Sequence, residues 1–202
     1  MLGRDIDAFI ALLEDKRDSL YMLIDSARDR HQLVPWLRRT QGLDAKCLFS
    51  GLRAVALADV APYLAQLPQR NAAMSWVMHK YWGSGKCWSV IVESEANFEQ
   101  TCLQLKKSLM VELDGGKSGY LRFYDARALE KFIATCAGQQ MEHLFGRCIR
   151  QFCFAPAILG DAPLMALRRQ VQTGLLTQKS SYQLVALHRQ DDCYVEDIQQ
   201  AA

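Results

Sequence analysis

The stretch Leu20-Tyr21-Met22-Leu23-Ile24-Asp25 is a short apolar run that ends at an acidic residue. A run of this kind, bounded by a polar residue, predicts a strand buried in a sheet. Pro62 stands just before another such run, where the missing backbone N–H is tolerated. The further candidate strands are Cys47–Phe49, Tyr63–Leu67, Trp88–Glu93 and Ile149–Phe154, and we expect the last of these to be the final strand of the sheet.

Segments with helical spacing separate these strands. Apolar residues recur three and four positions apart, which predicts helices, at Ile6–Leu13, Leu33–Leu37, Met74–Tyr81 (in a helix opened by Asn71), Phe98–Leu105, Leu129–Cys136 and Met141–Phe145. Asn97 followed by Gln100 resembles a capping box, and Asp125 can cap the helix after it. The alternation predicts an α/β fold, a mixed β-sheet flanked by helices.

A hairpin interrupts this alternation at Asp114-Gly115-Gly116. The strand patterns on either side are Leu109–Leu113 and Gly119–Tyr124. An Asp-Gly pair between two strands predicts a tight turn that requires positive φ, which Gly115 can adopt.

Side chains alternate along a strand, so the second strand of this hairpin predicts two faces. We expect Leu121 and Phe123 in the core and Tyr120, Arg122 and Tyr124 on the opposite side. An isolated buried charge is costly. Arg122 is therefore expected to be partly buried and paired, with Asp25 or Asp125 as its partner.

The pattern is less regular after Pro156, and we divide the chain into an α/β domain, 1–155, and a small C-terminal lobe or extension, 156–202. Leu164, Leu167 and Val171 have the spacing of a helix that ends at Gly174. Tyr182–Leu187 fits either a strand or a helix.

Composition limits the class of protein. The 202 residues are 50% hydrophobic and 23% charged, which excludes a disordered chain. Lys and Arg total 24 and Asp and Glu 22, too small a basic excess for electrostatic nucleic-acid binding. No run approaches the roughly 18 apolar residues of a membrane-spanning helix. The N-terminus lacks the pattern of a signal peptide, and the seven scattered cysteines suit a reducing cytoplasm.

Motifs for nucleotide, metal or nucleophilic chemistry are incomplete. Gly83-Ser84-Gly85-Lys86 and Gly115-Gly116-Lys117-Ser118 both lack the earlier glycine of a phosphate-binding loop. The sequence contains no Cys-x-x-Cys, no His-Glu-x-x-His and no Gly-x-Ser-x-Gly. We therefore expect no cofactor and no metal.

Two carboxylates leave an enzymatic alternative open. Asp25 and Asp125 each follow a predicted strand, and together at one edge of the sheet they could perform acid–base chemistry. Capping of a helix or loop is the competing interpretation, and it suits Asp125 directly. The alternative function is a small hydrolase-like enzyme that uses both residues.

Several motifs occur in a fixed order, at 20–29, 48–51, 60–64, Trp82-Gly83, 121–127 and 144–146. Their residues include Asp25, Pro62, Tyr63, Arg122, Tyr124 and Asp125. In this order the sequence resembles the type VI secretion effector chaperone, or adaptor, family. The resemblance covers about residues 19–154, and it departs from the family pattern at Ala126, where proline is expected.

The resemblance implies a binding protein of the bacterial cytoplasm, in a Gram-negative cell. Such a protein binds the N-terminal part of a toxin effector and loads it onto the trimeric spike protein of the secretion machine, without catalysis. It implies neither nucleic-acid binding nor membrane insertion. Because buried aromatics carry much of the energy of protein interfaces, we expect effector contacts at Trp36, Trp76 and Trp82, with the charges of Arg38 and Arg39 beside them.

Overall fold

The computed structural model describes residues 19–39, 44–66, 89–113, 115–155, 164–173, 178–190 and 193–199. The helices predicted at Ile6–Leu13 and Met74–Tyr81, together with Trp76 and Trp82, lie outside the described residues.

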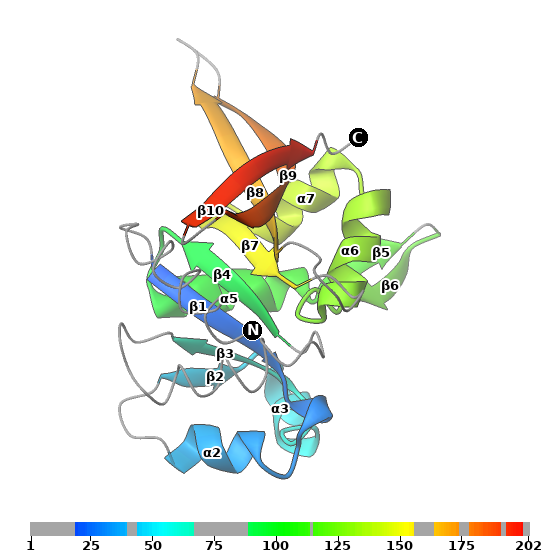
Figure 1. The fold of residues 1–202 in the computed structure, drawn as a ribbon. Coiled ribbons are helices and arrows are strands. Elements are labelled where there is room, and N and C mark those ends of the chain that lie inside the picture. Colours follow the sequence, from blue (N-terminus) through cyan, green and yellow to red (C-terminus); the bar gives the residue numbers. More distant parts are fainter. Residues whose placement is uncertain are drawn as a thin grey trace.

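One large sheet runs through the molecule (Figure 1). Within the described ranges it has eight strands in the order β10-β9-β8-β7-β4-β1-β3-β2. Their bounds are β1 Ser19–Asp25, β2 Ala45–Cys47, β3 Pro62–Gln66, β4 Ser89–Ser94, β7 Ile149–Phe154, β8 Leu164–Thr173, β9 Gln178–Gln190 and β10 Cys193–Gln199. The helices are α2 Leu33–Arg39, α3 Gly51–Ala56, α5 Phe98–Ser108, α6 Ala126–Thr135 and α7 Gly138–Phe145, with a 3-10 turn, η1, at Ser26–Arg28.

The predicted α/β architecture, a sheet flanked by helices, is confirmed. The strand directions differ from the predicted mixture, because every described pairing in the sheet is antiparallel. The connection from β4 to β7 shows why. It contains α5, α6 and α7, yet β7 begins at the same end of the sheet at which β4 finishes, so that Ser94 lies opposite Ile149. Intervening helices therefore do not impose a parallel crossover.

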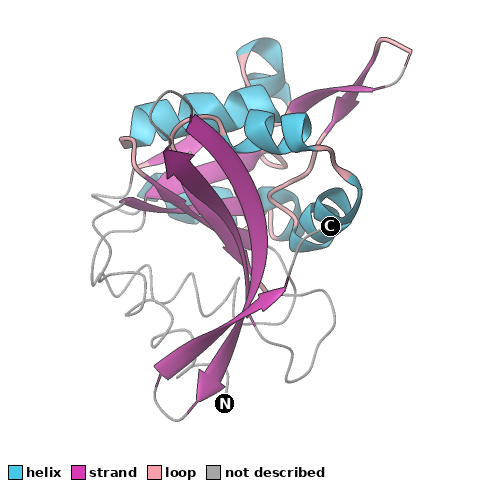
Figure 2. Cartoon of the chain, turned by 90° about the horizontal axis from the view of Figure 1, so that it is seen from above, coloured by secondary structure: helices cyan, strands magenta, loops and turns pink. Residues whose placement is uncertain are grey.

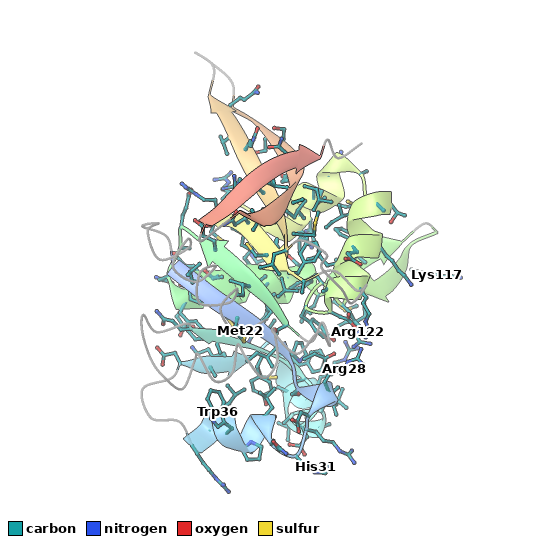
Figure 3. The ribbon with its side chains drawn as sticks, viewed as in Figure 1. Met22, Arg28, His31, Trp36, Lys117 and Arg122 are labelled. Carbon is teal, nitrogen blue, oxygen red and sulfur yellow. The ribbon has the colours of Figure 1, made fainter. Side chains whose placement is uncertain are left out.

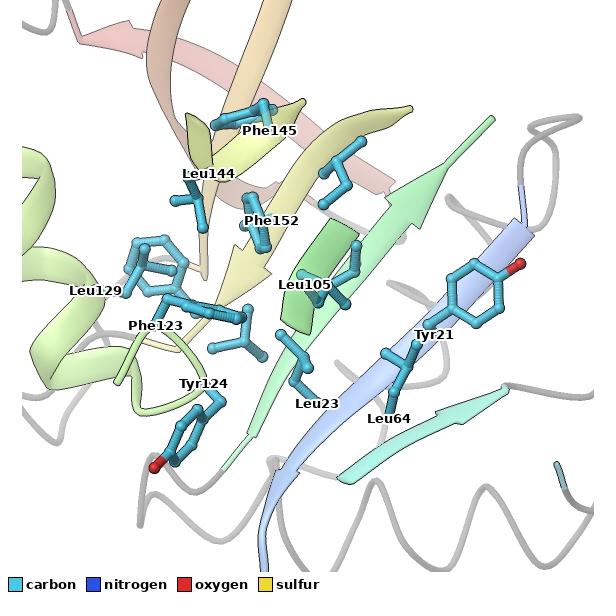
Figure 4. Packing of buried hydrophobic residues seen from close by; sticks show 14 of the residues in the cluster. Tyr21, Leu23, Leu64, Leu105, Phe123, Tyr124, Leu129, Leu144, Phe145 and Phe152 are labelled. Atoms are coloured by element: carbon cyan, nitrogen blue, oxygen red, sulfur yellow. The ribbon is translucent and has the colours of Figure 1, made fainter. Parts of the chain in front are cut away.

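Both faces of the sheet are buried, which explains the unbroken apolar run in β1. Met22 and Ile24 pack on one face with Leu33, Val34 and Leu37 of α2. Tyr21 and Leu23 point to the other face, where they join the core formed with α5, α6 and α7 (Figure 4). Figure 2 shows helices lined along one face of the sheet. Because side chains alternate along a strand, neighbouring residues of β1 pack into the hydrophobic cores on opposite faces of the sheet.

The C-terminal part continues the same sheet. The helix predicted at Leu164, Leu167 and Val171 is wrong, because these residues lie in β8. Leu164 contacts one core and Leu167 the other, so burial on both faces hides the period of two. Tyr182–Leu187 lies in β9, and β7 is not the final strand, since β8, β9 and β10 extend the sheet beyond it.

The predicted hairpin is present as β5 (Met110–Leu113) and β6 (Lys117–Tyr120), which form a separate two-stranded sheet. It projects from the main body (Figure 2). Gly115 and Gly116, at its tip, have φ of 79° and 71°, which confirms the need for positive φ.

The second hairpin strand is shorter than predicted. It ends at Tyr120, and the backbone N–H of Asp125 then donates to the carbonyl of Arg122 in a turn that leads into α6. Phe123 is buried, as predicted, but Tyr124 is buried too and Leu121 only partly, because the turn breaks the strand alternation. The cap of α6 by Asp125 overrides the strand pattern.

Helix caps agree with the sequence. The Asn97 side chain accepts a hydrogen bond from the Gln100 backbone N–H at 3.0 Å, at the start of α5. Within the described ranges, every helix is too short or too polar to cross a lipid bilayer.

Candidate functional site

Two aspartates lie nearly buried where separate segments of the chain meet. Asp25, at the end of β1, is 2% exposed, and Asp125, before α6, is 5% exposed. Each caps the element that follows it. Asp25 Oδ1 accepts from the Ala27 backbone N–H at 3.1 Å, and Asp125 Oδ1 accepts from the Arg127 backbone N–H at 3.1 Å. Capping orients each carboxylate locally, and one guanidinium nitrogen, Arg122 Nη2, lies within 4 Å of both, so the two aspartates are neighbours.

Three arginines surround these carboxylates, and Figure 3 labels two of them, Arg28 and Arg122. Arg122 Nη2 donates to Asp25 Oδ2 at 2.7 Å and lies 3.6 Å from Asp125 Oδ2. Arg28 Nη2 donates to Asp125 Oδ2 at 3.2 Å. Arg127 makes two side-chain hydrogen bonds to Asp125, from Nε at 3.0 Å and from Nη2 at 2.8 Å. We call these five residues the ion cluster.

The ion cluster has a buried acidic base and a basic outer surface. The two carboxylates are almost inaccessible, whereas the side chains of Arg28, Arg122 and Arg127 are 32%, 45% and 45% exposed. Buried carboxylates require charged partners because removal from water is costly. The cluster therefore joins the end of β1 to the turn before α6 and presents guanidinium groups to solvent.

Aromatic side chains extend the cluster toward the hairpin. The hydroxyl oxygens of Tyr120 and Tyr124 are 3.2 Å apart, and the Arg122 guanidinium lies 5.7 Å from the centre of the Tyr124 ring. Tyr120 also contacts Phe49, with ring centres 5.7 Å apart. Burial raises the pKa of both Tyr120 and Tyr124, so these phenols ionise at a higher pH than an exposed tyrosine does.

The family-motif residues Pro62 and Tyr63 lie in the adjacent strand. Pro62 is the register partner of Asp25 in the pairing of β1 with β3. The Tyr63 hydroxyl donates to the Ala58 carbonyl at 2.9 Å and so fixes the loop that leads into β3. Gly115, by contrast, lies in the turn between β5 and β6.

The predicted effector-binding residues that the structure describes lie on α2. Trp36 is half-buried and packs against the core, and Arg38 and Arg39 are exposed at the last turn of the helix. Trp76 and Trp82 are outside the described residues. The role of these residues in effector binding therefore stays a prediction.

Sequence reasoning anticipated part of the cluster and missed the rest. The pairing of Arg122 with Asp25 is confirmed, although the Arg122 side chain is more exposed than predicted. Arg28 and Arg127 were not singled out. The available signal was their spacing, three residues after Asp25 and two after Asp125, which places each guanidinium beside a capping carboxylate.

Every carboxylate oxygen of the two aspartates accepts at least one hydrogen bond from within the chain. Asp25 holds a backbone N–H and Arg122, and Asp125 holds a backbone N–H and two arginines. A general acid or base must instead reach the proton of a substrate. In the part of the chain that the structure describes, no group of three His, Cys, Asp or Glu side chains could hold a metal ion.

Comparison with known proteins identifies a family. Residues 20–143 match the family described as a domain of unknown function, DUF4123. The chain belongs to this family. The match begins at β1 and includes all five members of the ion cluster. No curated protein and no solved structure matches the chain.

Proposed function

We propose that this DUF4123 protein is a cytoplasmic chaperone, or adaptor, of type VI secretion. In this proposal it binds the N-terminal segment of a toxin effector, helps to load it onto the trimeric spike protein, and catalyses no reaction. The proposal rests on the ordered motifs that resemble the effector chaperone family, most of which lie within the matched residues 20–143.

One structural observation supports a binding role most strongly. The motif residues Asp25, Arg122 and Asp125 converge, although Asp25 and Arg122 are 97 positions apart, and they bind one another. Motif residues that satisfy each other's charges act as a scaffold. The surface that this scaffold supports is then free to bind a polypeptide.

The enzymatic alternative depends on the same two aspartates. Replacing Asp25 and Asp125 by asparagine keeps a capping oxygen at each position but removes the charge. Under the chaperone proposal, a folded double variant that binds the effector also supports its secretion. Loss of secretion from a variant that folds and still binds would favour the enzyme.

The decisive test of the proposal is secretion by a strain that lacks this gene. We expect the toxin encoded beside the gene to be absent from the medium and to return when the wild-type gene is supplied. A toxin from a different gene cluster, measured in the same culture, controls for general loss of secretion. Normal secretion of the neighbouring toxin without this protein would refute the proposal.

A further inference from the structure

Helix α3 exposes apolar side chains that a folded protein normally buries. None of its residues is buried, and Leu52 and Val55 are 88% and 80% exposed. These two residues are three positions apart and so lie on the same side of the helix. A helix of six residues is far too short to be stable alone and depends on packing of its apolar face.

Both ends of α3 are fastened to the region of the ion cluster. Before the helix, Phe49 contacts Tyr120, which in turn meets Tyr124. After the helix, the Ser26 hydroxyl lies 3.1 Å from the Asp59 carbonyl oxygen and 2.6 Å from that of Ala61. Ser26 directly follows Asp25. Helix α3 and the arginines of the cluster therefore belong to one end of the molecule, where Figure 3 labels Arg28 and Arg122.

Exposed arginines outnumber exposed aspartates at this end, where Asp59 is also exposed. Arg53 of α3 is exposed, and Arg28 and Arg122 are partly exposed, whereas the aspartates that hold the latter two lie beneath them. Arg122 has five N–H donors. Nη2 faces Asp25 and Asp125, the guanidinium also hydrogen-bonds to the Tyr124 hydroxyl, and the side chain is 45% exposed. Its outward N–H groups can receive a carboxylate from another molecule in a fixed geometry.

We propose that Leu52, Val55, Tyr120, Arg28 and Arg122 form a docking surface, the α3 surface, for an acidic amphipathic segment of the effector. The apolar side of that segment would cover Leu52 and Val55, and its carboxylates would meet the two arginines. The occupant follows from charge complementarity, because an apolar patch flanked by positive charge selects an apolar segment with negative flanks. This inference rests on the chaperone function proposed above.

The apolar half of the surface is tested by the double variant Leu52→Asp, Val55→Asp. The full-length protein is co-expressed with the full-length toxin encoded beside its gene, and the toxin retained on the tagged chaperone is measured. We expect at least a tenfold loss of retained toxin, because aspartate removes the apolar contact and repels the acidic residues of the bound segment. Leu103→Asp is the matched control, since Leu103 is 57% exposed on α5, and it should retain toxin within twofold of wild type.

The charged half is tested by Arg28→Gln, which leaves Asp125 its bonds from Arg127. Retained toxin should fall about threefold or more in 50 mM salt, and the variant should lose part of the salt dependence shown by wild type. Arg150→Gln is the control at the opposite end of the strands, where Arg150 pairs with Glu95. Equal retention by the Arg28 and Arg150 variants would overturn the electrostatic part of the proposal.

Failure of this inference is distinguishable from failure of the chaperone function. If wild-type protein retains the toxin and the folded Leu52/Val55 variant retains it equally, the α3 surface is wrong and the chaperone function stands. If wild-type protein retains no toxin, the chaperone function itself fails. Light scattering of the free protein adds a third outcome. Self-association that is abolished by the Leu52/Val55 variant would assign the surface to a second copy and overturn the effector assignment.

Discussion

Arg122 Nη2 donates a 2.7 Å hydrogen bond to Asp25 Oδ2, across 97 positions of sequence. A second bond, from Arg28 to Asp125, spans the same separation in the opposite sense. Each of two segments thus contributes one aspartate and one arginine, three positions apart, and the segments exchange ion pairs. This reciprocal arrangement holds the end of β1 against the turn that precedes α6.

Arg122→Ala is expected to lower the free energy of unfolding by about 1–2 kcal/mol. The substitution leaves the buried Asp25 carboxylate without its closest cation, which is costly, while partial exposure of Arg122 moderates the loss. Urea denaturation followed by circular dichroism measures the change. Arg150→Ala removes a pair whose side chains are both about half exposed, and should change stability by no more than about 0.5 kcal/mol. Equal losses in the two variants would contradict the role given to the ion cluster.

Stability should decrease at alkaline pH through the two tyrosines beside the cluster. Burial raises the pKa of Tyr120 and Tyr124 above the value of about 10 in an unfolded chain. Their contribution is therefore complete below about pH 10 and is lost as pH rises further, because the unfolded state releases the phenolic protons first. In denaturation experiments, the free energy of unfolding of Tyr120→Phe should fall less steeply than that of wild type between about pH 9.5 and 11, which brackets the unfolded tyrosine pKa of about 10. Superimposable pH profiles of wild type and variant would rule out this contribution.

The hairpin turn predicts a local effect of substitution. Gly115 has φ of 79°, and no atom lies within 4 Å of the position that a Cβ would occupy. Gly115→Ala should therefore act through backbone strain, costing about 1–2 kcal/mol. Faster amide exchange in β5 and β6 is the expected readout. Gly138→Ala is the matched control, because that glycine has equal space and no positive φ, and it should leave exchange in the hairpin unchanged.

Two thiols are expected to react slowly in the folded protein. Burial raises the pKa of Cys47 and of Cys102, so little of either is thiolate, the nucleophilic form, at pH 8. Alkylation with iodoacetamide, located by peptide mass spectrometry, should be at least tenfold slower at these positions than in the same protein in urea. Cys102, only 3% exposed, should be the slower of the two. Rapid labelling of Cys102 under native conditions would contradict its place in the core.

The sequence identifies the central strands because a strand buried on both faces is a run of consecutive apolar residues. A short apolar run bounded by a polar residue, such as Leu20–Ile24, predicts a buried strand, and the structure confirms β1. In β8, residues spaced as in a helix are held instead by pairing with β9, where Leu164 lies opposite Leu187. That pairing is a long-range contact, and local periodicity carries no information about it.

The candidate site was predictable only in part, for a similar reason. The cost of a buried charge is a general rule, and it predicted a carboxylate partner for Arg122. The bond from Arg28 to Asp125 could not be predicted, because it depends on how two turns far apart in the sequence pack against each other. The exposure of Leu52 and Val55 was also hidden, since their identity alone predicts burial.

The most direct test of the central claim is the mass of the complex formed with the neighbouring toxin. The full-length protein and the full-length toxin are co-expressed and purified through a tag on the toxin, and the eluate is measured by size-exclusion chromatography with light scattering. The account predicts that both chains elute together, at a mass equal to the sum of bound subunits. Elution of the toxin alone, with this protein folded and separate, would contradict the claim.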